Sequence, residues 1–393
     1  MANNKVALKI CKKYTYETVL NRLKEGFALL GGIENFIKPK QKVLIKPDIY
    51  CNTLPNRAKT THHNMVSAVA ELVAKLGAKC IIADSPLGDF NQLHLDRVYE
   101  KTRMLEASNN GYATLNINDK IDVITNQNGE FCRDINIMDV INDVDVIINL
   151  GKFRCEKNLG LIGCSQNLFG LVPGRLKSVV KSRCHTLTSY YNYIIDLNEA
   201  LEDKVVLNIL DGIVGCEANG DPRILNSIIM GQSQYAVDCV ALQIINQNPQ
   251  EYLLFNECER RGKFDFDCDI TGDKISSVVC EDFKYSNFLE NIKPGSNGKF
   301  KREYNSIQKR PIISAKQCKG CKVCSNNCPM QAINIQSNQL GETAVINRQK
   351  CVNCLKCVDN CPYKIIKVKT PCKHYHIERM IKKHSKTNND IDE

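Results

Sequence analysis

Eight cysteines near the C-terminus occur in two short runs with the same spacing, and this pattern constrains the fold more than any other feature of the chain. The runs are Cys318, Cys321, Cys324 and Cys328, and then Cys351, Cys354, Cys357 and Cys361. A shift of 33 residues superposes all eight in pairs, which indicates duplication of one short unit. Three thiolates this close together can surround one metal cluster only if the backbone curls tightly, so the fourth ligand must come from elsewhere.

The spacing C-x2-C-x2-C-x3-C-P is that of bacterial ferredoxins, in which the fourth cysteine of each run ligates the other run's cluster. It predicts two [4Fe-4S] clusters. The predicted ligand sets are Cys318, Cys321, Cys324 and Cys361 for one cluster, and Cys351, Cys354, Cys357 and Cys328 for the other. Structural zinc is the alternative, but zinc sites use cysteine pairs separated by a longer loop and would leave one cysteine of each run unused.

The region around these runs reads as a small α+β ferredoxin-type domain. Residues 332–336 and 343–347 are expected to form a β-hairpin between the two runs. A domain of about 60 residues has little core, so cluster ligation should supply much of its folding energy. The predicted organisation is an α/β domain at 1–285, a linker at 286–310, the ferredoxin-type domain at 311–370 and a charged tail at 371–393.

Composition places the chain among soluble proteins, with 43% hydrophobic and 24% charged residues. The N-terminus lacks the apolar run of a signal peptide, and no stretch approaches the ~20 apolar residues that span a bilayer. These features predict a cytoplasmic protein with no membrane association. The cysteines before the first run form no C-x2-C pair and are expected to stay reduced; beside two clusters, they favour an anaerobic or low-oxygen cell.

The net charge of +10 is concentrated near the C-terminus, because the chain from Lys316 onward carries +8. Each oxidised cubane with four thiolates carries a charge of about −2, which offsets this excess. A basic region can also bind nucleic acid. No interleaved aromatic residues and no nucleic-acid-binding motif accompany it, so no nucleic-acid partner is expected.

In the first 285 residues, short apolar segments alternate with amphipathic ones, which predicts an α/β domain with a largely parallel sheet. Strands are expected at 5–10, 42–45, 79–83, 144–150 and 204–210, and helices at 16–30, 64–76, 187–201 and 236–245. Asn64 is expected to be the N-cap of the second helix. No Gly-rich nucleotide-binding motif follows a strand, so a nucleotide or flavin has no support here.

Polar residues follow four of the predicted strands, and ligands of open α/β sheets bind at the carboxyl ends of strands. Lys152, Arg154, Asp84 and Asp211 are therefore expected to converge in one cleft. The full set of candidate catalytic residues is Lys46, Asp84, Lys152, Arg154, Asn167, Lys177, His185, Asp211 and Asp238. The alternative interpretation of each is ordinary turn chemistry or a solvated charge.

Three of these candidates are cations, Lys152, Arg154 and Lys177, which would attract an anionic substrate. His185 is the best proton donor by intrinsic pKa, although it could equally be a capping or core histidine. The adjacent pair His62-His63 could ligate a metal. Neighbouring side chains diverge, so at most one of the two rings is expected to face the site.

Five blocks of the chain resemble the family known as domain of unknown function 362, whose members are often fused to a C-terminal two-cluster ferredoxin. The blocks are residues 44–47, 83–88, 148–152, 166–174 and 236–238, in the family's order, and the resemblance covers roughly 5–285. Two departures stand out: Arg154-Cys155-Glu156 lacks the family's histidine, and Gln166 replaces its lysine. If those positions bind a ligand, the ligand of this chain differs.

The sequence therefore supports three functional interpretations. In the first, the chain is an iron-sulfur redox protein, and its two clusters relay single electrons to or from a site in the α/β domain. This interpretation makes it a candidate oxidoreductase. In the second, the chain is a non-enzymatic electron-carrying adaptor that docks on a separate oxidoreductase. In the third, the clusters are structural and lie beside a small-ligand-binding domain. The expected partner is a redox protein or a small anionic substrate.

Overall fold

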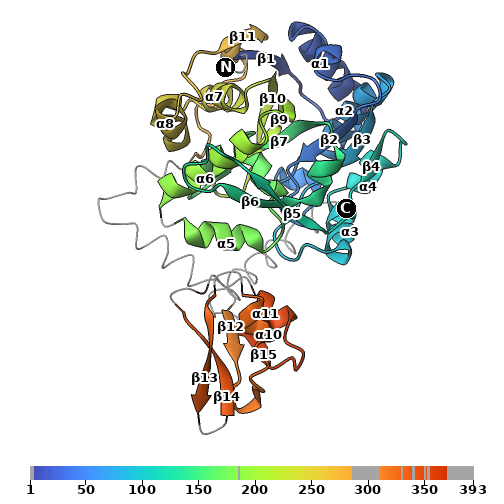
Figure 1. Cartoon of the computed structure of the whole chain (residues 1–393). Helices are drawn as coiled ribbons and strands as arrows, with labels where there is room; N and C mark the ends of the chain where they lie inside the picture. The colour runs from blue at the N-terminus through green and yellow to red at the C-terminus, as the bar shows by residue number, and fades with distance from the viewer. Residues whose placement is uncertain are drawn as a thin grey trace, which may run out of the picture. The chain divides into compact units, whose positions relative to one another are not determined.

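The computed structural model describes residues 4–184, 186–285, 310–328, 331–338, 341–348, 351 and 355–369. They divide into two compact units (Figure 1). The first contains the described residues up to Lys177 and those from Thr186 to 285; the second contains 178–184 and the described residues from Arg310 onward. His185, the predicted tail at 371–393 and all of the predicted linker except Arg310 lie outside the described residues.

The first unit is built on a mixed sheet of nine strands, in the order β11-β1-β10-β9-β7-β2-β3-β4, with β8 beside β7. The strands are β1 (Lys5–Ile10), β2 (Lys42–Pro47), β3 (Lys79–Ile82), β4 (Ala113–Leu115), β7 (Val146–Glu156), β8 (Gly160–Leu161), β9 (Val205–Cys216), β10 (Pro222–Gly231) and β11 (Asp269–Gly272). Strand β10 runs antiparallel to both of its neighbours, and the pairs β1–β11, β2–β3, β2–β7, β3–β4 and β7–β9 are parallel. The predicted α/β class with a largely parallel sheet is confirmed.

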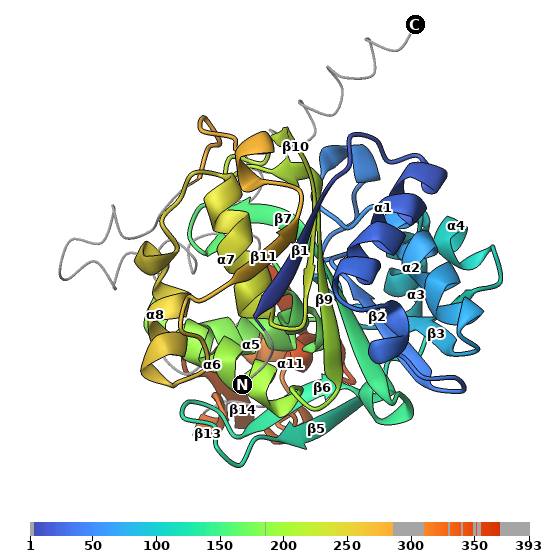
Figure 2. The same ribbon diagram turned by 90° about the horizontal axis from the view of Figure 1, so that it is seen from above.

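Helices cover both faces of this sheet, with α1 and α2 on one face and α7 on the other (Figure 2). The α-helices of the chain before residue 286 are α1 (Tyr16–Leu29), α2 (His63–Lys75), α3 (Gln92–Lys101), α4 (Met104–Ser108), α5 (Leu176–Arg183), α6 (Leu187–Ala200), α7 (Gln234–Ile244) and α8 (Leu253–Arg260). Residues 178–183 of α5 belong to the second unit. Short 3-10 helices are η1 (Ile33–Asn35), η2 (Pro55–Arg57), η3 (Asp139–Asp143), η4 (Asn167–Leu171), η5 (Pro249–Glu251) and η6 (Ile275–Ser277). None of the helices in the described ranges has the length and apolar character to cross a bilayer.

The main core lies between the sheet and the helices α1 and α2. Leu23 and Phe27 lie four residues apart on one face of α1, and both are buried. Val69 of α2 is buried as well. They pack with strand residues such as Ile45 and Ile148 in one apolar cluster. Burial of this stripe stabilises the helices more than their local propensities do.

Two features of the sequence prediction are corrected. Strands β7 and β9 do not end near residues 150 and 210, because their pairing continues to Arg154 opposite Cys216. Lys152, Arg154 and Asp211 therefore lie within strands, not after them. The N-cap of α2 is His62, whose side chain accepts the backbone N–H of Asn64, and not Asn64 itself.

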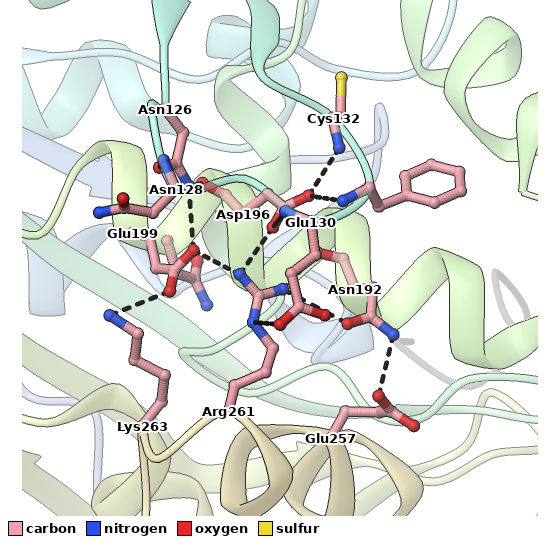
Figure 3. A network of polar contacts seen from close by, with 12 residues as sticks. Asn126, Asn128, Glu130, Cys132, Asn192, Asp196, Glu199, Glu257, Arg261 and Lys263 are labelled. Carbon is pink, nitrogen blue, oxygen red and sulfur yellow. Dashed lines mark hydrogen bonds and ion pairs between the residues drawn. The ribbon is translucent and has the colours of Figure 1, made fainter.

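A polar network joins the loop after β5 to α6 and to the chain just after α8 (Figure 3). The strands β5 (Ile121–Thr125) and β6 (Asp134–Met138) form a separate antiparallel hairpin. Asp196 of α6 accepts the backbone N–H groups of Glu130, Phe131 and Cys132 at 3.1, 2.8 and 2.7 Å, and its carboxylate lies 2.7 Å from Arg261. The buried carboxylate is fully satisfied, so this network ties the hairpin loop to the helices.

The second unit has two small antiparallel sheets, one of β12 (Arg310–Ile313) with β15 (Ile366–Lys369) and one of β13 (Ile333–Asn338) with β14 (Gly341–Ile346). Its short helices are η8 (Ala315–Gln317), α10 (Val323–Asn326) and α11 (Lys356–Asp359). The predicted hairpin is confirmed as β13–β14. Helix α11 follows α10 at the repeat distance of the cysteine runs, so the duplication in sequence is also a duplication in structure.

Candidate functional site

Four cysteines from both runs line one pocket of the second unit, here called the cysteine pocket. They are Cys318, Cys321, Cys324 and Cys361. Cys318 follows η8, Cys321 and Cys324 flank the start of α10, and Cys361 follows α11. Four cysteines that line one space match the number and type of ligands of a [4Fe-4S] cluster, so these residues fit the group that the sequence predicts.

The backbone of both halves of the second unit turns tightly through residues in the left-handed region. Lys322, between the second and third cysteines, has φ +63°, and Leu355 occupies the equivalent position of the second run with φ +62°. Gln331 and Lys364 form a second such pair, with φ +46° and +51°. Non-glycine residues adopt this region rarely, so its recurrence at equivalent positions indicates that the two halves share the same tight turns.

Among the described residues of the second unit, two backbone N–H groups donate to cysteine sulfur atoms. The N–H of Ala344 donates to Cys318 Sγ at 3.4 Å, and that of Ala332 donates to Cys328 Sγ at 3.2 Å. Hydrogen bonds to the sulfur ligands are among the factors that set the reduction potential of an iron-sulfur cluster. Cys357, a predicted ligand of the other cluster, belongs to the apolar core of this unit together with Cys324 and Cys361, and Cys328 packs against that core. Cys354 lies outside the described residues.

In the first unit, Lys46 and Asp84 form a buried ion pair at the carboxyl edge of the sheet. Lys46 Nζ lies 3.0 Å from Asp84 Oδ1 and donates to Asn167 Oδ1 at 2.8 Å. A Cβ atom on Gly170 would lie 2.1 Å from Asp84 Oδ1, so only glycine permits this approach. The structure thus brings together three predicted site residues, Lys46, Asp84 and Asn167, in the interior.

Lys152 and Asp211 form a second buried pair, 2.9 Å apart, between β7 and β9. Tyr14, which follows β1, joins this pair: its hydroxyl donates to Asp211 Oδ1 at 2.6 Å and accepts from Lys152 Nζ at 2.8 Å. Burial, followed by the negative charge of Asp211, raises the pKa of Tyr14 well above its usual value, so the phenol stays protonated.

The remaining cations of the predicted site also face protein acceptors. Arg154 pairs with Asp48 at 3.1 Å and with Glu156. Lys177 Nζ donates to the carbonyl oxygens of Ser85, Gly170 and Val172 at 2.6, 3.2 and 2.5 Å. Each positive charge is thus compensated within the protein, in an interior where the side chains are almost fully buried.

Asp238, on α7, binds the loop after β8. Its carboxylate accepts the backbone N–H of Cys164 at 2.7 Å and both the N–H and the hydroxyl of Ser165. Burial raises the pKa of Asp238 to about 7, and the hydrogen bonds from Ser165 and Cys164 oppose that shift. The geometry is that of a loop anchor, separate from the two ion pairs above.

Sequence reasoning missed an open pocket of about 420 Å³ in the first unit. This space, here called the imidazole pocket, is lined by Tyr14, Leu54, Pro55, Asn56, His62, His63, Arg103 and Val214. None of the candidate catalytic residues lines it. Lys152 and Asp211 lie behind it and hold Tyr14, and Asp211 also accepts the backbone N–H of His62 at 3.0 Å.

The aromatic rings of this pocket form a stack. The Tyr14 and His62 ring centroids are 3.9 Å apart with an interplanar angle of 10°, and those of His62 and His63 are 4.3 Å apart. The two neighbouring side chains do not diverge as expected from the sequence, because both line the same pocket. His62 has extended backbone as the N-cap and His63 begins the helix, and this change of direction brings adjacent rings together.

Both histidines are held neutral. Burial, reinforced by neighbouring His63, lowers the pKa of His62 to about 3, and burial also lowers that of His63. Since His62 Nδ1 accepts the N–H of Asn64, the proton of the neutral ring resides on Nε2. His63 Nε2 lies 3.4 Å from Glu106, while its buried Nδ1 has no hydrogen-bond partner among the described residues.

Comparison with known proteins places these two units in recognised families. Residues 43–243 match the family described as Domain of unknown function (DUF362), and residues 317–365 match a 4Fe-4S dicluster domain. The Thylakoid-associated protein sll1697 of Synechocystis sp. is 29% identical over 268 residues, which cover 65% of this chain and 79% of that protein.

A solved structure, the lactate racemase apoprotein from Thermoanaerobacterium thermosaccharolyticum, aligns with a TM-score of 0.40 and 15% identity. The alignment covers 61% of this chain and 57% of the other, so this chain spans under two thirds of that structure's length. The sequence match, in contrast, extends over half of the chain. The protein therefore belongs to the family described as Domain of unknown function (DUF362), and it carries a 4Fe-4S dicluster domain in its C-terminal part.

Proposed function

We propose that this protein transfers single electrons through two [4Fe-4S] clusters, to or from a small substrate bound by the α/β unit. The observation that carries the proposal is the cysteine pocket, where Cys361 of the second run joins three cysteines of the first. This arrangement supports crossed ligation, in which each run completes the other's cluster. Each cluster, when bound, supplies reversible one-electron exchange.

The residues of the second unit support that role. The N–H groups of Ala344 and Ala332 stabilise charge on ligand sulfur, which raises the reduction potential. Apolar residues of the same unit, including Ile333 and Ile366, pack around the buried Cys324, Cys357 and Cys361 and limit the access of water there. Lys319 and Lys322 line the cysteine pocket and offset negative charge there.

The site proposed for the substrate is the imidazole pocket and not the group of residues nominated from the sequence. The imidazole pocket is open and holds hydrogen-bonding groups, whereas the nominated residues are buried and paired with protein partners. An open pocket with apolar walls and few polar groups is the usual form of a small-molecule site.

A second candidate function is an electron-carrying adaptor that docks on a separate oxidoreductase. Lys46, Lys152 and Arg154 each form an ion pair with a buried carboxylate of the protein, which favours this alternative. Side chains paired in this way stabilise the fold and leave no charge to bind a substrate. Under it, the clusters still exchange single electrons, and the acceptor is a protein.

Anaerobic reductive titration tests the proposal. Protein isolated without oxygen should take up about two electrons per chain from dithionite, one for each cluster. A single-electron uptake with all cysteines intact, or zinc in place of iron, would contradict it. Reoxidation of the reduced protein by the low-molecular-mass fraction of a cell extract supports the enzyme, and reoxidation by the protein fraction alone supports the adaptor.

A further inference from the structure

We propose that the imidazole pocket binds a small monocarboxylate, which Arg103 holds by charge and His62 by a hydrogen bond from Nε2. The proposal deepens the function above: it rests on that function for naming the ligand as the substrate, while the binding itself requires no electron transfer. Four features of the first unit carry it, and each concerns a different property of the pocket.

The first feature is the exposed edge of the His62 ring. Tyr14 covers one face of the imidazole at 3.9 Å and His63 stacks on it at 4.3 Å, so a ligand reaches the ring by its edge. On that edge, Nδ1 is occupied by the N–H of Asn64. The remaining polar group is Nε2–H, which has no acceptor among the described residues. His62 therefore offers a hydrogen-bond donor to the pocket.

The second feature is the sign of the pocket's charge. Arg103 is the one charged residue among those that line it, and no lining residue is acidic. The Nε of Arg103 lies 3.5 Å from Glu106 Oε1, and both side chains of this pair are about half exposed. An exposed pair of this kind is weak and is screened by solvent. A carboxylate can thus bind the two terminal nitrogens of the guanidinium, which match its two oxygens.

The third feature is the helix that begins at the pocket. Helix α2 has 13 residues, with His62 as its N-cap and His63 as its first residue. The N-terminal end of such a helix carries partial positive charge and favours anions. His63 lines the same pocket, and its buried Nδ1 has no hydrogen-bond partner among the described residues. This wall of the pocket therefore contains a polar atom whose hydrogen-bonding capacity is unused.

The fourth feature is the balance of size, charge and apolar surface. The pocket holds about 420 Å³, and Leu54, Pro55 and Val214 supply apolar walls. A volume of this size accommodates a ring or a short chain beside the carboxylate. One guanidinium with two neutral histidines matches a single negative charge, whereas a dianionic phosphate would require a second cation.

Benzoate and benzamide provide matched probes, because they share shape and differ in charge. Saturation-transfer NMR on the anaerobically isolated full chain should show saturable binding of benzoate and at least tenfold weaker binding of benzamide. Arg103→Gln and His62→Asn should each weaken benzoate about tenfold or more, since each removes a hydrogen bond to a charged group. Asparagine at position 62 retains an N-cap acceptor and lacks the Nε2 donor.

Two positions on helix α3 provide control variants. Arg97→Gln and His94→Asn remove the same residue types outside the pocket and should leave benzoate affinity unchanged. Equal binding of benzamide, unchanged affinity in Arg103→Gln and His62→Asn, or displacement of benzoate by lower concentrations of inorganic phosphate would each overturn the proposal. Cluster absorbance and electron uptake, measured on the same samples, report the proposed electron transfer separately.

Discussion

Lys152 and Asp211 are register partners on β7 and β9, and their side chains form an ion pair of 2.9 Å with almost no exposed surface. The pair fixes the Tyr14 hydroxyl, which contacts both side chains. Tyr14 in turn stacks on His62. A buried charge pair within the sheet thus positions one wall of the imidazole pocket.

Lys152→Met should lower the free energy of unfolding by about 3–5 kcal/mol, because it leaves the Asp211 carboxylate buried without its cation. Lys152→Met combined with Asp211→Asn should recover part of this loss. Arg22→Met, which breaks the exposed pair with Glu25, should change stability by under about 1 kcal/mol. Urea unfolding measures all three, and equal effects of Lys152→Met and Arg22→Met would contradict the burial of the pair.

Crossed ligation predicts which cysteine substitutions act on the same cluster. Cys361→Ala should damage the cluster of Cys318, so the double variant Cys318→Ala/Cys361→Ala should lose one cluster, about four iron atoms of about eight. Cys351→Ala/Cys361→Ala should lose both clusters. Iron and acid-labile sulfide analysis after anaerobic purification measures the difference. Retention of one cluster in the Cys351→Ala/Cys361→Ala variant would show that each run binds its own cluster.

The lowered pKa of His62 predicts how the free energy of unfolding depends on pH. Its pKa is lowered from 6.5 to about 3 in the folded state. Between these values the unfolded chain binds a proton that the folded chain does not, so stability falls as pH decreases through this range. The contribution is about 1.4 kcal/mol per pH unit. His62→Asn removes it, so urea unfolding between pH 4 and 6 should have a shallower pH slope than in wild type; identical slopes would exclude this pKa shift.

Substitutions of Asp196 and Glu130 compare a buried carboxylate with an exposed one in the network of Figure 3. Asp196→Ala removes the acceptor of three backbone N–H groups and one of the carboxylate partners of Arg261, which keeps Glu199. It should destabilise the protein by about 3 kcal/mol or more, because each donor left unsatisfied costs about 1–3 kcal/mol. It should also increase proteolysis in the 126–132 loop. Glu130→Ala, whose ion pair with Arg260 is exposed, should do neither. Urea unfolding and limited proteolysis report the two effects, and equal cleavage of both variants would refute the anchoring role.

Local sequence was sufficient to predict those features of the structure that depend on residues close together in the chain. The repeated cysteine spacing predicted the dicluster domain, and the left-handed Lys322 and Leu355 recur at equivalent positions of the two runs because each tight turn involves only a few adjacent residues. Alternation of apolar segments likewise predicted the α/β sheet, and turn residues predicted the β13–β14 hairpin. These features are set by neighbours along the chain.

Tertiary structure decided what the polar residues do. The pairing of β7 with β9 carries Lys152 and Arg154 into the sheet, and strand length depends on this partner and not on the local sequence. Tyr14, His62 and Arg103 come from separate connections, so their meeting in the imidazole pocket leaves no local pattern. The sequence by itself determined the fold class and the repeated cysteine spacing of the dicluster domain. Side-chain burial and partners arise only when distant segments pack, and these define the pocket.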